Sequence, residues 1–414
     1  MAGQLGRVLH YHLRFYQLLG FHGLPLPGDA HPLRTQRCLQ IWSFCLMIFL
    51  GTLAVFCVCS EDEFIHIGDT FGSFNDVLKY TVGGIAVVSI YVETLISHRH
   101  LARFWRLHGL LSDLLPSSTS TSSSWWRELR QHWRYLSWFH GLTASELALL
   151  AFFSLGQGTI RRHLVLFWTT FQPFVWLTHI RNIQFVLHVE LLRQQLKQLA
   201  HELNLLAEYS KFANRRASFE GFENYLRRQL RQKQLIYDKI YDMYTSFQAA
   251  FRYSMLTVLL MIGVRISVDC YFMYYTIYNN INDIDYLFIL PALLEIPAFI
   301  YTSRGCMEML PRIAYKLHSI TPGPTSSSYP TLSLQIQNFS LQMMHQPVVI
   351  HALGITILDG YLLTRVSINR TFLKNIKNFH NFNLKFLKIR NRMIKRQKCL
   401  GWVLCMRTEG GQGN

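Results

Sequence analysis

Long apolar runs alternate with basic connections along the chain. A helix that spans a bilayer needs roughly 20 mostly apolar residues, and six runs reach about that length. These runs lie at residues 38–59, 77–96, 136–155, 164–180, 254–278 and 286–302. The pattern predicts an all-α polytopic membrane protein with six clear transmembrane helices, in which residues 1–37 form a segment before a bundle at 38–304.

Lys and Arg collect in alternate connections, and the side that holds them is expected to face the cytosol. Residues 1–37 and 97–135 contain several Arg, whereas residues 60–76 contain neither Lys nor Arg. The short turn with Arg161 and Arg162 breaks this alternation. The other connections place the amino terminus and the long basic segment at residues 181–252 in the cytosol.

The segment at residues 181–252 has the pattern of long helices. Leucines recur there at steps of three and four residues, which places them on one helical face: Leu192, Leu196, Leu199, Leu203 and Leu206. A second helical stretch runs from about Phe219 into the fifth span. These stretches are either two solvated helices or extensions of the fourth and fifth spans that pack together. We favour packing, because isolated helices are only marginally stable.

Composition agrees with a membrane protein. Only 16% of the residues are charged, against about a quarter in a typical soluble domain. The net charge of +17 raises nucleic-acid binding as an alternative. However, the basic residues lie between apolar runs instead of forming one patch. The expected partner is therefore the lipid bilayer and not nucleic acid.

Motifs for catalysis or for a cofactor are missing from the sequence. It contains no GxSxG, no phosphate-binding glycine-rich loop, no HExxH and no CxxC. Most of the 8 cysteines lie in or beside apolar runs, where Cys acts as a small hydrophobic residue. We expect no enzyme activity, no cofactor and no metal site.

Ionisable residues within the spans are candidates for a binding site, because burying them is costly unless they pair or face a watery cavity. Arg265 and Asp269 are four residues apart in the fifth span and share a helical face. Glu295 lies between Pro291 and Pro297 in the sixth span. Two interpretations remain open for each: a buried structural group, or one wall of a polar ligand pocket.

Aromatic residues gather in the outer halves of the fourth and fifth spans. Trp168 and Tyr275 belong to these clusters, and Gln172 adds a polar group among them. Such residues are also common membrane anchors, but aromatic walls with few polar groups suit small organic ligands. The candidate ligand-binding residues are Trp168, Gln172, Arg265, Asp269, Tyr275 and Glu295.

Two further carboxylates are weaker candidates. Glu146 lies within the third span. Glu93 lies near the inner end of the second span, and its neighbours His98 and Arg99 predict a position at the membrane interface.

The cytosolic amino terminus, the helical extensions and the closing segment "GITILDGYLLTRV" resemble the insect gustatory receptor family over residues 1 to about 366. The resemblance implies seven helices and a tetrameric, ligand-gated cation channel in the plasma membrane of gustatory neurons. It implies a small-molecule tastant in a pocket among the outer halves of the helices. It also implies other gustatory receptor subunits as partners, with the seventh helix lining the pore.

The end of the sequence departs from that family. Residues 305–365 fit a cytosolic segment that leads to the seventh span, but the family's Thr-Tyr and Gln-Phe pairs are absent after Leu363. Residues 366–414 are basic and contain a single acidic residue, Glu409. Burying them would cost about 2.5 to 3.5 kcal/mol per central Lys or Arg.

We therefore expect the tail at 366–414 to lie in the cytosol, which makes a truncated six-span protein without a pore the alternative. The origin of this tail is a retained intron, an alternative terminal exon or a natural C-terminus. Sequencing the transcript across the codons for Arg365 and Val366 tests the retained intron.

Overall fold

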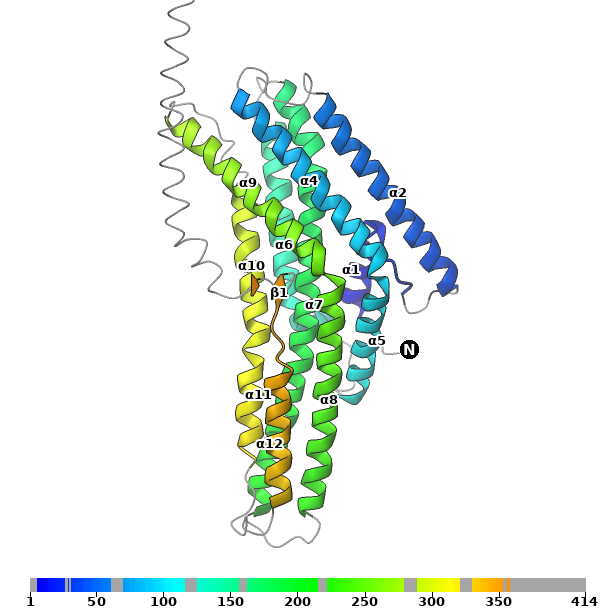
Figure 1. Cartoon of the computed structure of the whole chain (residues 1–414), viewed down its shortest axis with the longest axis vertical. Helices are drawn as coiled ribbons and strands as arrows, with labels where there is room; N and C mark the ends of the chain where they lie inside the picture. The colour runs from blue at the N-terminus through cyan, green and yellow to red at the C-terminus, as the bar shows by residue number, and fades with distance from the viewer. Residues whose placement is uncertain are drawn as a thin grey trace, which may run out of the picture. The chain divides into compact units, whose positions relative to one another are not determined.

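The computed structural model describes residues 6–26, 29, 31–60, 70–115, 125–155, 162–214, 222–278, 289–320, 330–352 and 356–357, and most of the side chains in these ranges. They belong to one compact unit, Met1–Asp359, and are almost entirely helical (Figure 1). The predicted all-α class is confirmed, apart from one very short hairpin. The expected seventh span and the tail at 366–414 lie outside the described residues.

The first four described helices are α1 (Arg7–Leu18), α2 (Pro32–Cys59), α4 (Thr70–Ile96) and α5 (His98–Leu114). Helix α2 starts earlier than the predicted span, with Pro32 in its first turn. Proline is favoured there because the first N–H groups of a helix have no intrahelical partner. α2 packs along α4, and α5 packs against α8.

The next four helices are α6 (Trp125–Leu155), α7 (Arg162–Asn214), α8 (Phe222–Ala250) and α9 (Arg252–Tyr278). α7 runs without a break for 53 residues, so one helix contains both the predicted fourth span and its extension. α10 (Ile289–Met307), α11 (Met309–His318) and α12 (Pro330–His345) follow. The strands β1 (His351–Ala352) and β2 (Thr356–Ile357) then pair antiparallel.

Among the described residues, three helices are long and apolar enough to cross a membrane: Pro32–Cys59, Gly72–Ile96 and Arg252–Cys270. They correspond to the first, second and fifth predicted spans. The other three predicted spans lie in α6, α7 and α10, and their membrane crossing stays a prediction.

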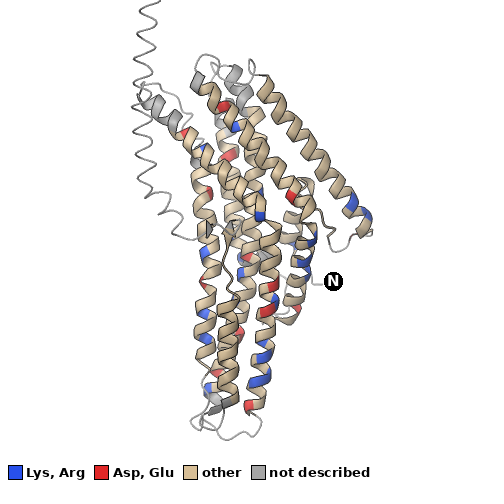
Figure 2. Cartoon of the chain, in the orientation of Figure 1, with Lys and Arg blue, Asp and Glu red and all other residues tan. Residues whose placement is uncertain are grey.

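The second half of α7 packs against α8 and α11, and α12 packs against α8 (Figure 1). Leu192, Leu196, Leu199 and Leu203 of α7 are fully buried. This burial agrees with packed extensions rather than two separate solvated helices. Positions of Lys, Arg, Asp and Glu are spread along α8 and α11 (Figure 2).

The predicted continuous helix from about Phe219 into the fifth span is wrong. The chain breaks at Phe251, between α8 and α9. The Glu93 carboxylate of α4 accepts hydrogen bonds there from the backbone N–H groups of Tyr253 (2.5 Å) and Ser254 (3.1 Å). A carboxylate satisfies the free N–H groups of a helix start, so Glu93 stabilises the beginning of α9.

The end of α1 and the segment after it are more than a lead into the first span. Their backbone carbonyls accept side-chain hydrogen bonds from three helices: Trp42 to Leu18 (2.8 Å), Ser43 to Gly20 (2.7 Å), Tyr91 to Leu19 (2.9 Å) and Gln184 to Phe21 (3.1 Å). Phe21 is completely buried. These contacts hold the segment against α2, α4 and α7, which a hydropathy pattern does not reveal.

Buried histidines lie beside this segment, around the ring of Trp105. The Trp105 centroid is 6.0 Å from His22 and 5.5 Å from His188. Burial lowers the pKa of His22 to about 4. Burial also lowers the pKa of His188 to about 3, although the hydrogen bond from its Nδ1 to the Gln184 carbonyl acts in the opposite direction. Both imidazoles are therefore neutral at pH 7.

We expect Gly20→Ala to destabilise the protein. Gly20 has φ of 74°, a region that costs a residue with a side chain about 1 to 2 kcal/mol. An added Cβ would also lie 3.1 Å from Leu46 Cδ1 and 3.2 Å from Ser43 Cα. The measurement is the apparent melting temperature of the purified full chain. Gly109→Ala is the matched control, because nothing lies within 4 Å there; an equal loss in both variants would contradict the assignment.

Stability should fall as the pH drops below about 6.5, the pKa of histidine in an unfolded chain. Below this pH, His22 and His188 become protonated in the unfolded state but stay neutral in the folded state. Each histidine then lowers the free energy of unfolding by on the order of 1 kcal/mol per pH unit, until the pH reaches its pKa in the folded state. His22→Gln should make the melting temperature less dependent on pH between 7 and 5. His100→Gln, at an exposed position, should leave that dependence unchanged.

Candidate functional site

A row of buried polar side chains joins α4, α6, α7 and α9. Lys79 Nζ lies 2.8 Å from Asp269 Oδ1, and Asp269 Oδ2 lies 3.7 Å from Arg265 Nε. Arg265 Nη1 in turn lies 3.1 Å from Glu146 Oε1, and Gln172 Nε2 donates to Glu146 Oε2 at 2.8 Å. We call Lys79, Asp269, Arg265, Glu146 and Gln172 the charge ladder.

Opposite charges alternate along the charge ladder, which explains why it is tolerated inside the bundle. The four charged side chains are at most 5% exposed. A buried ion is costly unless an opposite charge and hydrogen bonds compensate it. Two cations and two anions provide this compensation, so the group is neutral as a whole.

A second polar group joins α7 to α10. The Glu295 carboxylate accepts a hydrogen bond from Asn182 Nδ2 at 2.7 Å and contacts His179 Nδ1. His179 and Asn182 are three residues apart, so they lie on one face of α7. A single carboxylate therefore bridges two positions of α7.

A third polar group lies where the predicted fourth span meets its extension. Arg181 Nη2 lies 3.1 Å from Glu93 Oε2, and Nη1 donates to Gln184 at 2.8 Å. The Arg181 guanidinium also lies 4.2 Å from the centroid of the Phe251 ring, a cation–π contact. Glu93 is only 4% exposed, and its predicted position at the membrane interface stays a prediction. Its sequence neighbours His98 and Arg99 are not its partners in these contacts.

The structure brings together half of the predicted site residues. Gln172, Arg265 and Asp269 belong to the charge ladder, whereas Glu295 belongs to the separate group on α10. The side chains of Trp168 and Tyr275 lie outside the described residues.

The predicted set missed Lys79, and it left out Glu146 as a weaker candidate. A signal for Lys79 existed, since it is the only Lys in the second predicted span. The predicted pairing of Arg265 with Asp269 is present, but each has a closer partner on another helix.

Some buried polar atoms near the charge ladder have no hydrogen-bond partner among the residues that the structure describes. They are Gln172 Oε1, Asp269 Oδ2 and Trp176 Nε1. Two of these atoms accept hydrogen bonds and one donates, and Asp269 Oδ2 also lies 3.7 Å from Arg265 Nε. Within the same described residues, no group of three or more His, Cys, Asp or Glu is arranged to hold a metal ion.

Comparison with known families identifies the family of this chain. Residues 9–367 match the 7tm chemosensory receptor family, which covers most of the chain. The chain belongs to this family. The family match ends one residue after Val366, where the sequence analysis places the start of the atypical tail.

A solved structure shares the fold of this chemosensory receptor. The insect olfactory receptor OR5 from Machilis hrabei, solved in complex with eugenol, matches with a TM-score of 0.50 and 11% identity. The match covers 88% of this chain and 96% of that one. No curated protein matches by sequence. Family membership and the apolar helices together support a membrane receptor and not an enzyme.

We expect the loss of one charge from the ladder to destabilise the protein more than the loss of two opposite charges together. Glu146→Gln or Arg265→Met alone leaves an uncompensated buried charge, at a cost of about 3 kcal/mol or more. The double variant removes one charge of each sign and keeps the Lys79–Asp269 pair. Its apparent melting temperature should therefore fall by less than the sum of the two single losses.

The exposed Arg304–Glu308 pair provides the control for this experiment. Glu308→Gln should change stability by at most about 1 kcal/mol, as expected for a surface pair. Strictly additive losses at Glu146 and Arg265 would show that the two side chains do not interact.

Proposed function

We propose that this chemosensory receptor is a gustatory receptor subunit, a cation channel that small-molecule tastants open. The charge ladder is the observation that carries the proposal. It places donor and acceptor atoms inside a mainly apolar bundle, which is the chemistry of a small-molecule pocket. The structural relative was solved with eugenol, a small organic molecule, which agrees with a ligand of this class.

Ligand binding would act on the contacts that join the helices. A ligand that bonds to Gln172 Oε1 or Asp269 Oδ2 changes the balance of the Glu146–Arg265 and Lys79–Asp269 pairs. Such a ligand opens the channel only if it binds the open arrangement more tightly than the closed one. In this proposal, the ion pairs between α6 and α9 and between α4 and α9 differ between the open and closed arrangements, so the ligand binds the two with different affinity.

Assembly with other gustatory receptor subunits, as a tetramer in the plasma membrane of gustatory neurons, completes the proposal. We call α8, α11, α12 and the second half of α7 the lower bundle. Large apolar side chains are exposed there, among them Leu235 (58%), Leu334 (56%) and Met344 (73%). Exposed apolar residues outside the bilayer are typical of surfaces that pack against another protein. They support contacts between subunits in this region.

A second candidate function follows from the composition of residues 366–414. Their Lys and Arg content and single acidic residue do not suit a pore-lining helix in lipid. A subunit without such a helix would be inert, or would act as a partner that modifies other receptor subunits.

The expected result is a cation current when the chain is expressed with other receptor subunits and exposed to small aromatic compounds, eugenol included. Gln172→Ala should raise the half-maximal concentration about tenfold, which is the effect of one lost hydrogen bond at a buried site. Gln232→Ala, at an exposed position of α8, should leave the response unchanged. Patch-clamp recording measures both.

The chain expressed alone separates the two candidates. If it gives no current, but a chain with an apolar helix in place of residues 366–414 does, the subunit without a pore is favoured. No current in any combination, with the protein present at the cell surface, would contradict the channel proposal.

A further inference from the structure

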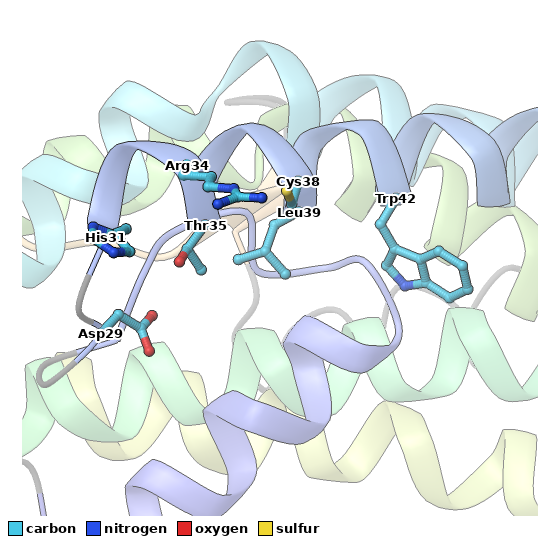
Figure 3. Close-up of a pocket in the computed structure, with 7 residues that line it drawn as sticks. All are labelled: Asp29, His31, Arg34, Thr35, Cys38, Leu39 and Trp42. Atoms are coloured by element: carbon cyan, nitrogen blue, oxygen red, sulfur yellow. The ribbon is translucent and has the colours of Figure 1, made fainter.

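A groove of about 480 Å³ opens between the first three turns of α2 and the segment that precedes it (Figure 3). His31, Arg34 and Thr35 line it from α2 and its start, with Asp29 opposite. None of the residues that line it belongs to the charge ladder, so the groove is a separate feature of the molecule.

The polarity of the groove changes along its length. His31 and Arg34 lie at one end, whereas Leu39 and Trp42 lie further along α2 (Figure 3). Arg34 and Trp42 are eight residues apart, which is about 12 Å along a helix. Because α2 is long and apolar enough to cross a membrane, this polarity runs in the same direction as that of a bilayer leaflet, from headgroups to acyl chains.

The polar end is cationic. The Arg34 side chain is exposed, and none of the carboxylates that the structure describes lies within ion-pair distance of it. Asp29 is the one acidic residue in the lining. Its Oδ1 pairs with Arg14 at 3.1 Å, and its Oδ2 accepts the Leu26 N–H at 3.0 Å. The charge of Asp29 is therefore already compensated, and the charge of Arg34 is available.

The apolar end is open to lipid. Trp42 is 45% exposed, and its Nε1 is held by the Leu18 carbonyl at 2.8 Å. Ile41, next to Trp42, is 63% exposed. Trp is favoured at membrane interfaces because it combines an apolar ring with one polar atom. Figure 2 shows Lys and Arg only at the start of α2.

We propose that this groove binds one anionic phospholipid of the leaflet that contains the start of α2. Its phosphate and acidic headgroup contact Arg34 and His31. The upper part of one acyl chain lies along Leu39 and Trp42. Basic side chains at the membrane surface attract anionic lipids, and the guanidinium of Arg suits phosphate because it donates several hydrogen bonds in one plane.

Native mass spectrometry of the purified full chain, with defined lipids added, tests the proposal. Phosphatidylserine should bind about fivefold more tightly than phosphatidylcholine, the effect of one Arg at a membrane surface. Arg34→Gln should abolish this preference. The matched control is Arg37→Gln, which removes the same charge from an exposed position of α2 outside the groove, and the preference should persist.

Soluble probes distinguish a lipid from a free anion. Inorganic phosphate and glycerophosphoserine, which lacks acyl chains, should not displace the bound lipid. Displacement by either would overturn the proposal in favour of a simple anion site. Equal losses in Arg34→Gln and Arg37→Gln would overturn it too, because they would show a general surface charge effect. His31→Ala, at an exposed position, gives a second variant if Arg34→Gln does not fold; an unchanged preference in it would also contradict the headgroup contact.

Discussion

Charge pairing between helices is the constraint on which the rest of the bundle depends. In a membrane, apolar side chains do not favour one helix neighbour over lipid, so packing and polar contacts must select the partners. Here Lys79 of α4 meets Asp269 of α9, and Arg265 of α9 meets Glu146 of α6. Each charge is tolerated only next to its partner. The buried pairs therefore specify which helices lie together, and at which height.

α7 connects these polar groups to the lower bundle. Along this one helix, Gln172 belongs to the charge ladder, His179 and Asn182 hold Glu295, and Arg181 holds Glu93. Its leucine face then packs against α8 and α11. Helix α7 is 53 residues long and contains Pro173, which has no N–H to donate. The helix continues on both sides of this proline, so the polar groups and the leucine face belong to one element. The arrangement links the charge ladder, where a ligand is proposed to bind, with the surface where subunits are proposed to meet.

The sequence was sufficient for most of the helices and for one pair of the charge ladder, because both depend on local patterns. Apolar runs located the helices, and the spacing of Arg265 and Asp269 indicated a shared face. The cross-helix partners were not accessible in this way, since Lys79 and Asp269 are 190 residues apart. The partners of Glu93 were equally inaccessible, because Arg181 and the start of α9 are far from it in the sequence.

Hydrogen bonds to Glu93 fix the start of α9, the helix that carries Arg265 and Asp269 of the charge ladder. Glu93 holds the N–H groups of Tyr253 and Ser254, about 18 Å along the helix from Arg265. In the proposed mechanism, a ligand that draws Arg265 away from Glu146 turns or shifts α9 against this fixed end. Because Glu93 also binds Arg181 of α7, such a movement of α9 would act on the helix that enters the lower bundle. A ligand without hydrogen-bonding groups has nothing to exchange with the ladder pairs, so polar atoms on the ligand are a requirement of this mechanism.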